Sequence, residues 1–190
     1  MLKSNFFVIT GPSGVGKDSV IEGLKKKMPE LISVITTSTR PMREGEKEGY
    51  PYYFISREAF ETKIAANEFL EWANVYGNYY GSEMKEVERM RQLNGPAVFK
   101  IDIQGARALK KNMPEIYVIF IAPQDHATLA RWIRGRGKDA PEAMERRLNT
   151  AKHELADLSE WDAVVINEDG KLGEAVQNIF DIIRTHLLRI

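Results

Sequence analysis

The sequence predicts an α/β fold in which a parallel sheet is flanked by helices. Short apolar runs alternate with longer segments whose apolar residues recur at helical spacing, and parallel sheets covered on both faces show this alternation. A glycine-rich turn separates the first apolar run from the first helical pattern. The length of 190 residues suits one compact domain with insertions, large enough to bury a core.

Strands are predicted where short apolar runs lie between turn residues, at residues 6–10, 97–103, 117–122 and 163–166. Helical spacing predicts a first helix at residues 17–28, which Pro29 ends, and a last helix at about 171–188. Another helix is expected to begin at Pro141, because proline is favoured at the first position of a helix.

Residues 34–83 interrupt this alternation. The segment is rich in Thr, Tyr, Gly and Arg, and only residues 56–67 show a clear helical pattern. Because parallel strands need crossover connections, a long segment without them predicts a subdomain inserted into the α/β core. A second irregular segment, residues 134–147, is basic and contains glycines.

Composition and charge narrow the class of protein. Lys plus Arg and Asp plus Glu both total 27, so the net charge of zero argues against a nucleic-acid-binding protein. The sequence has no cysteine, which excludes disulfides and thiolate metal sites and fits a reducing compartment. The N-terminal apolar run is too short for a signal-peptide core or a membrane span. We therefore expect a cytoplasmic protein that binds neither nucleic acid nor a membrane.

The glycine-rich turn matches the phosphate-binding pattern G-x-x-x-x-G-K. Glycines let the backbone curl so that its N–H groups point at phosphate oxygens, and the helix N-terminus and the lysine add positive charge. A chance turn with several glycines is the alternative, but the motif lies between a predicted strand and a predicted helix, as a phosphate loop requires. The sequence therefore predicts a P-loop NTPase-type core whose loop is formed by Gly11, Pro12, Ser13, Gly14, Val15, Gly16 and Lys17.

The residue after Lys17 departs from the usual pattern. A Ser or Thr hydroxyl normally binds Mg²⁺ at this position, whereas this chain has Asp18 followed by Ser19. A carboxylate is a stronger oxygen ligand for Mg²⁺, but it also brings negative charge near a triphosphate. Asp18 is thus a candidate Mg²⁺ ligand, and its net effect on nucleotide binding stays open at this point.

Arginines and tyrosines in the inserted segment form a second candidate anion site. Arg40 and Arg43 lie three residues apart and close in sequence to several tyrosines, which suits the binding of a monophosphate. An exposed strand rich in Thr, Tyr and Arg has a similar composition. The residues alone leave both interpretations open.

Several segments, in order along nearly the whole chain, resemble guanylate kinase. They are the phosphate loop, T-T-S-T-R-P-M-R-E-G-E at 36–46, G-Y-P-Y-Y-F at 49–54, F-L-E-W-A at 69–73, G-N-Y-Y-G-S at 77–82 and I-D-I-Q-G at 101–105. The resemblance implies in-line, Mg²⁺-dependent transfer of the γ-phosphate of ATP to GMP. It also implies a P-loop core (1–33, 84–125 and 155–190), a GMP-binding subdomain (34–83) and a lid (126–154).

The resemblance also implies a role for individual residues. It places the GMP phosphate on Arg40, Arg43, Tyr52 and Tyr80, and guanine on Thr36, Glu71, Ser82 and Asp102. A carboxylate suits guanine because N1–H and N2–H₂ are adjacent donors that adenine lacks. The resemblance places ATP on residues 11–19, the lid arginine Arg136 and Asn167, and implies the catalytic set Lys17, Arg40, Arg136 and Arg147.

Two further positions depart from the family pattern. Lys100 stands where an acidic residue is typical, and Trp132 stands where a lid arginine is common. We interpret Asp18 and Lys100 as linked changes, with one acid added to the loop as another was lost from the strand.

Two other functions compete with this interpretation. The Gly-Lys-Asp-Ser loop also resembles ribose 1,5-bisphosphate phosphokinase, but a sugar substrate has no base for Glu71 to bind. Non-catalytic guanylate-kinase-like binding domains typically lose the phosphate loop, whereas this chain keeps Lys17. Both a monomer and a homodimer are compatible with the sequence.

Overall fold

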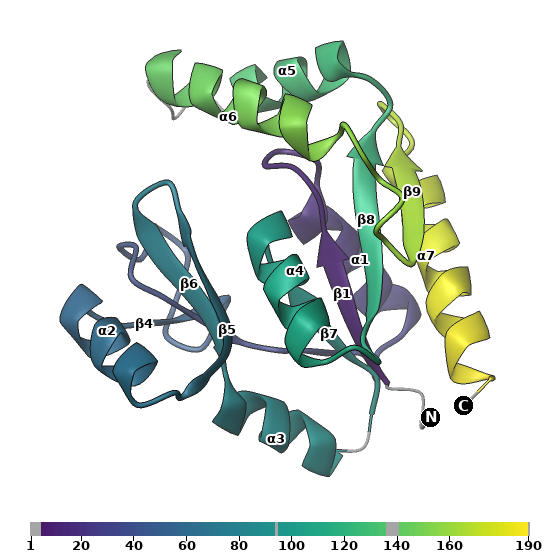
Figure 1. The fold of residues 1–190 in the computed structure, drawn as a ribbon. Helices are drawn as coiled ribbons and strands as arrows, with labels where there is room; N and C mark the ends of the chain where they lie inside the picture. The colour runs from purple at the N-terminus through teal and green to yellow at the C-terminus, as the bar shows by residue number, and fades with distance from the viewer. Residues whose placement is uncertain (1–4, 94, 136–140, 190) are drawn as a thin grey trace.

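The structure is a computed structural model that describes residues 5–93, 95–135 and 141–189. Five parallel strands form the main sheet in the order β2-β7-β1-β8-β9, as the alternating sequence pattern predicts (Figure 1). Their bounds are β1 (Phe6–Thr10), β2 (Ile32–Ser33), β7 (Ala97–Lys100), β8 (Tyr117–Pro123) and β9 (Ala163–Asn167). The α/β fold class predicted from the sequence is confirmed.

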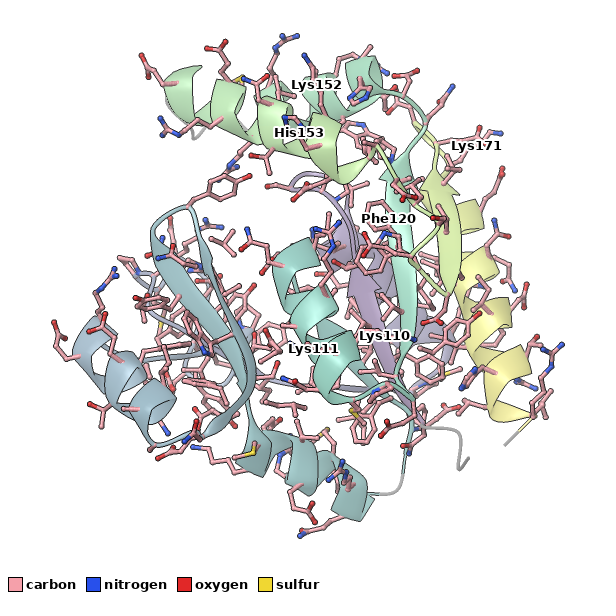
Figure 2. All side chains as sticks on the ribbon, in the orientation of Figure 1. Lys110, Lys111, Phe120, Lys152, His153 and Lys171 are labelled. Carbon is pink, nitrogen blue, oxygen red and sulfur yellow. The ribbon has the colours of Figure 1, made fainter. Side chains whose placement is uncertain are left out.

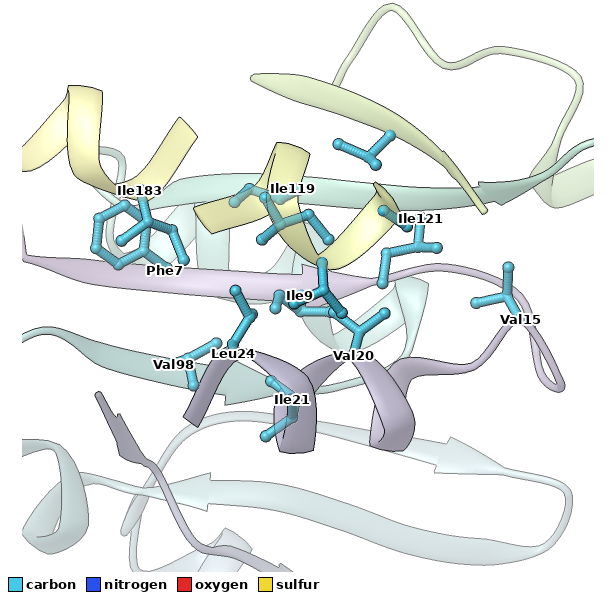
Figure 3. Close-up of a cluster of buried hydrophobic side chains, with 14 of the residues drawn as sticks. Phe7, Ile9, Val15, Val20, Ile21, Leu24, Val98, Ile119, Ile121 and Ile183 are labelled. Atoms are coloured by element: carbon cyan, nitrogen blue, oxygen red, sulfur yellow. The ribbon is translucent and has the colours of Figure 1, made fainter. Parts of the chain in front are cut away.

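Helices cover both faces of this sheet because its side chains alternate in direction. Phe7 and Ile9 of β1 are fully buried in one apolar layer, together with residues of α1 (Lys17–Lys27) and α7 (Leu172–Leu187) (Figure 3). Phe6 and Val8 belong to the opposite layer, which includes residues of α3 (Met84–Leu93) and α4 (Ile103–Asn112). Each fully buried side chain of this kind stabilises the fold by roughly 1.5–3 kcal/mol. These two layers hold the carboxyl ends of the strands in place.

The segment between β2 and α3 forms a second, four-stranded sheet in the order β4-β3-β6-β5. Its strands are β3 (Thr36–Ser38), β4 (Tyr52–Phe54), β5 (Phe69–Val75) and β6 (Asn78–Glu83). Helix α2 (Arg57–Ala65) covers this sheet through Phe60, whose ring stacks on Phe69 with centroids 4.2 Å apart. The hairpin between β5 and β6 turns at Tyr76 and Gly77, which both have positive φ angles, as a tight hairpin turn requires.

Two antiparallel helices, α5 (His126–Gly135) and α6 (Pro141–Glu154), extend beyond the carboxyl ends of β1 and β8 (Figure 1). The α6 helix begins at Pro141 as predicted. In the same view, α6 extends above the region between the main sheet and the β5–β6 hairpin. None of the helices in the described ranges has the length and apolar character needed to cross a membrane.

The strand predicted at residues 97–103 is shorter in the structure, which corrects that prediction. It ends at Lys100, because Asp102 caps the N-terminus of α4: its Oδ1 accepts hydrogen bonds from the N–H groups of Gln104 (2.8 Å) and Gly105 (3.2 Å). Side-chain caps satisfy the free N–H groups of a helix start and so fix where it begins. As a result, Asp102 lies at the carboxyl edge of the sheet.

Candidate active site

The phosphate loop follows β1 at the carboxyl edge of the parallel sheet, where ligands of open α/β sheets bind. Gly11 has a φ of 141°, and a Cβ at this position would lie 2.3 Å from the carbonyl oxygen of Ile121. Only glycine therefore allows the loop to pass so close to β8. The loop leads into α1, whose N-terminus carries partial positive charge.

The Lys17 ammonium folds back over the loop. Its Nζ donates to the carbonyl oxygens of Gly11 (2.5 Å) and Pro12 (3.0 Å). Burial lowers the pKa of Lys17 to about 8, although the nearby carboxylates Glu154, Asp18 and Asp102 act in the opposite direction. A buried ammonium whose partners are neutral carbonyls is ready to bind an anion such as a phosphate.

A cleft of about 350 Å³ extends from the phosphate loop to the second sheet. It brings together many of the residues singled out in the sequence. Those that line it are Gly11, Ser13, Lys17, Asp18, Thr36, Arg43, Tyr52, Glu71, Tyr80, Asp102 and Arg147. The remaining members of the predicted set that the structure describes, which do not line the cleft, are Pro12, Gly14, Val15, Gly16, Ser19, Arg40, Ser82 and Asn167.

Glu71 is a buried carboxylate in the wall of this cleft, with 4% of its surface exposed. The hydroxyl of Ser82 donates to its Oε1 at 2.6 Å, so Ser82 acts on the site through Glu71. Burial raises the pKa of Glu71 to about 7; the Ser82 hydrogen bond opposes this shift, and the charge of Asp102 adds to it. A Cβ at Gly105 would lie 2.8 Å from Oε2 of Glu71, so the glycine leaves room for this carboxylate against the start of α4.

Arg40 and Arg43 occupy different positions. Arg43 lines the cleft, whereas Arg40 is buried and bonds Glu46 through two nitrogens, at 2.7 and 2.5 Å. The Arg40 guanidinium also lies over the Tyr52 ring, 5.0 Å from its centroid. The hydrogen bond to Glu46 raises the pKa of Arg40 further, so this residue is a fixed positive charge behind Tyr52.

The α6 helix closes the cleft on the side opposite the second sheet. Arg147, Thr150 and Glu154 all line the cleft, and their spacing places them on one helix face. The Arg147 guanidinium lies 5.4 Å from the centroid of the Tyr76 ring, so the helix and the β5–β6 hairpin meet across the cleft. Figure 2, where Lys152 and His153 mark α6, shows side chains between this helix and the hairpin. Arg136, the other predicted lid arginine, lies outside the described residues.

Asn167 ends β9 beside the phosphate loop. Its Nδ2 donates to the carbonyl oxygen of Val15 at 2.9 Å, while its buried Oδ1 has no hydrogen-bond partner among the described residues. Trp132, which stands where a lid arginine is common, instead donates from Nε1 to Asp169 at 3.0 Å. Asn167 therefore holds the phosphate loop through Val15, with its Oδ1 buried beside the loop.

Comparison with known proteins agrees with this geometry. A family model described as guanylate kinase matches residues 3–186. The chain belongs to the guanylate kinase family. Curated family members include guanylate kinase of Carboxydothermus hydrogenoformans, 39% identical over 100% of this chain and 92% of the relative. Guanylate kinase of Thermobifida fusca is 41% identical over 84% of this chain and 82% of the relative.

A solved structure of the guanylate kinase family has the same fold. The crystal structure of guanylate kinase from Anaplasma phagocytophilum matches 97% of this chain and 87% of its own, with a TM-score of 0.74 and 28% identity. The family and the fold class implied by the sequence resemblance are therefore both confirmed.

The structure also adds residues that the sequence reasoning did not assign to the guanylate kinase site. Thr150 and Glu154 follow Arg147 at helical spacing, and that periodicity was a usable signal. Tyr76 reaches the cleft from the hairpin tip. Lys100 was noted as a departure linked to Asp18 but was given no role in the site. Its ammonium bonds the carboxylate of Asp18, so the two unusual residues are direct partners.

Proposed function

We propose that the protein transfers the γ-phosphate of ATP to GMP, forming ADP and GDP. The observation that carries this proposal is the placement of Glu71 in the same cleft as the phosphate loop. A phosphate loop alone serves many nucleotide-binding enzymes, but a buried carboxylate facing this cleft supplies the acceptor that guanine N1–H and N2–H₂ need. The names of the curated relatives support the same function.

The acceptor nucleotide is proposed to lie along the second sheet. Its base would reach Glu71, Asp102 and Thr36, with Ser82 holding the Glu71 carboxylate in position. Its phosphate would lie on Arg43, Tyr52 and Tyr80, with the fixed charge of Arg40 behind Tyr52. Hydrogen bonds from neutral phenols and an arginine orient a phosphate without a covalent step.

The donor nucleotide is proposed to place its phosphates on the loop backbone, the N-terminus of α1 and the Lys17 ammonium. Binding would draw this ammonium away from the carbonyls of Gly11 and Pro12. The family resemblance places adenine near Asn167, whose side chain holds the phosphate loop through Val15. Arg147, and Arg136 beyond the described residues, would bring positive charge to the phosphoryl group as it moves.

Mg²⁺ fits this donor site with few protein ligands. Within the described ranges, no three His, Cys, Asp or Glu side chains are grouped as a metal site, but nucleotide-bound Mg²⁺ needs only one or two protein oxygens beside phosphates and waters. Asp18 would supply a carboxylate oxygen, and Ser19 is the alternative. When bound, Mg²⁺ would neutralise negative charge on the phosphates.

The three parts of the chain are proposed to act as separate units. Residues 34–83 would bind GMP, residues 126–154 would form the lid, and residues 1–33, 84–125 and 155–190 would form the phosphate-loop core. The separate four-stranded sheet of residues 34–83 supports this division. The contact between Arg147 and Tyr76 would join the lid to the GMP-binding unit across the cleft. Closure of this kind would exclude water, which otherwise competes for the phosphoryl group.

We expect ATP-dependent phosphorylation of GMP at a kcat/KM at least about 100-fold higher than that of AMP. The wrong base would leave buried polar groups such as Glu71 unpaired, and that costs several kcal/mol. A coupled assay for ADP over GMP, AMP, UMP, CMP and ribose 1,5-bisphosphate measures this directly. Faster turnover of ribose 1,5-bisphosphate than of GMP would contradict the proposal, and no ADP release with any acceptor would favour a non-catalytic binding domain.

We also expect ATP binding to depend strongly on Mg²⁺ because of Asp18. A carboxylate beside the triphosphate repels ATP without the metal, whereas a divalent cation between them attracts both groups. In calorimetric titrations with EDTA, Asp18→Asn should bind ATP more tightly than the wild type does. With Mg²⁺, the variant should gain less affinity than the wild type gains.

The matched control for this experiment is Glu22→Gln, which removes a carboxylate one turn further along α1. Its gain in ATP affinity from Mg²⁺ should equal that of the wild type. An equal gain in Asp18→Asn would show that Ser19 or water, rather than Asp18, binds the metal.

A further inference from the structure

Lys100 lines the cleft at the carboxyl end of β7. It is the last residue of β7, and Ile9 of β1 is its register partner at the edge of the sheet that leads into the phosphate loop. Its side chain lines the 350 Å³ cleft together with Lys17 and Arg43. The strand ends here because Asp102 begins the next helix, so the backbone holds the lysine in a defined place.

The Lys100 ammonium contacts both halves of the site. On the core side it bonds the carboxylate of Asp18 at the start of α1. On the other side it lies 5.2 Å from the centroid of the Tyr52 ring. Tyr52 in turn lies beside Tyr80, with ring centroids 5.7 Å apart. Lys100 therefore reaches the group of residues that we propose to bind the acceptor phosphate.

The partner that holds Lys100 in this structure is easily exchanged. The side chain of Asp18 is 66% exposed, while that of Lys100 is only 20% exposed. An ion pair with a solvent-exposed carboxylate adds little to stability, because water competes for the carboxylate. A charged, mostly covered ammonium gains more from a phosphate dianion than from one exposed carboxylate.

We propose that Lys100 is a further substrate-binding residue that contacts the phosphate of the acceptor nucleotide, and that Asp18 holds its ammonium until that phosphate arrives. This inference rests on the proposed function, because it presumes an acceptor monophosphate beside Tyr52. It assigns a role to a lysine at a position where the family resemblance implies an acidic residue. It also explains why the two unusual residues, Asp18 and Lys100, occur together.

Paired titrations of GMP and guanosine, without ATP or metal, isolate the contribution of the phosphate. The ratio of their affinities should fall about tenfold in Lys100→Met, which corresponds to about 1.4 kcal/mol. Lys100→Arg should keep most of the ratio because it keeps the charge. The matched control is Lys25→Met on α1, which lines a neighbouring cavity with Lys100 but not this cleft, and it should leave the ratio unchanged.

Asp18→Asn tests whether Lys100 binds the phosphate or only forms a structural ion pair with Asp18. If Asp18 competes with the phosphate for Lys100, this variant should bind GMP about threefold more tightly, and the gain should shrink in a Lys100→Met background. If the ion pair only supports the fold, each single variant should lose affinity for GMP and for guanosine by the same factor. That second pattern would overturn the proposal.

A folding control and a comparison with the wild type separate failure of the Lys100 proposal from misfolding and from failure of the proposed function. Thermal unfolding identifies a misfolded Lys100→Met, and Lys100→Gln then replaces it in the same titrations. If the wild type fails to bind GMP, the proposed function itself is wrong. If the wild type binds GMP with a normal phosphate contribution and Lys100→Met, or Lys100→Gln in its place, keeps that contribution, only the role of Lys100 is wrong.

Discussion

Replacing Glu71 with Gln is expected to raise the KM for GMP about 100-fold and to leave the KM for ATP nearly unchanged. The amide would place an N–H₂ donor against the N1–H and N2–H₂ donors of guanine while removing one of two acceptor oxygens. Polar groups left unpaired in a buried pocket give large discrimination. Steady-state kinetics with each substrate varied in turn measures both constants.

The pH dependence of Glu71 provides a second readout. Guanine needs the ionised carboxylate, and burial raises the pKa of this group to about 7 in the free protein. The kcat/KM for GMP should therefore fall about tenfold per pH unit as the pH drops below about 7, because kcat/KM reports groups of the free enzyme. Glu71→Gln does not ionise, so its profile should lack this acid limb.

Glu83→Gln is the matched control for Glu71→Gln. Glu83 is also a buried carboxylate of the second sheet, but it bonds Thr37 and Lys63 and does not line the cleft. We expect it to lower the stability of the protein without changing the KM for GMP by more than about twofold. Equal KM effects in the two variants would show that Glu71 supports the fold rather than binding the base.

Replacing Lys17 with Met is expected to lower kcat about 1000-fold. We propose that the Lys17 ammonium reaches the outer phosphates of ATP. Loss of one well-placed charge or donor in a transition state costs two to three orders of magnitude. Methionine matches the length of the lysine stem and removes a buried charge, so the unfolding temperature should not fall. A fall in kcat without a fall in the unfolding temperature would therefore show a role of Lys17 in catalysis rather than in folding.

The pH profile for ATP tests the same residue. Burial lowers the pKa of Lys17 to about 8, so the free protein loses this positive charge as the pH rises above that value. The kcat/KM for ATP should fall above about pH 8, whereas kcat should fall only at higher pH, because a bound triphosphate favours the ammonium. Lys26→Met, an exposed lysine of α1, should keep the wild-type profile. A profile unchanged in Lys17→Met would contradict this role.

Local sequence patterns predicted the helices and the loop whose conformation depends mainly on residues close in sequence. The phosphate loop is contiguous and needs glycines such as Gly11, and α1 and α7 follow long apolar periodicities. Helices α3, α4 and α5 were not among the predicted elements. Each has only ten residues, and helices this short depend on packing against the rest of the fold rather than on their own propensity.

The sequence by itself determined the fold class and the phosphate loop, and its family motifs led to the prediction that Glu71 binds guanine. Only the tertiary structure decided which side chains meet. Asp18 and Lys100 are 82 residues apart, and they pair because β7 lies beside β1 in the sheet. Glu46 holds Arg40 behind Tyr52, and Arg147 crosses the cleft to Tyr76. Local patterns encode backbone conformation. These contacts instead depend on strand order and on how the two sheets and α6 pack, and no short segment contains that information.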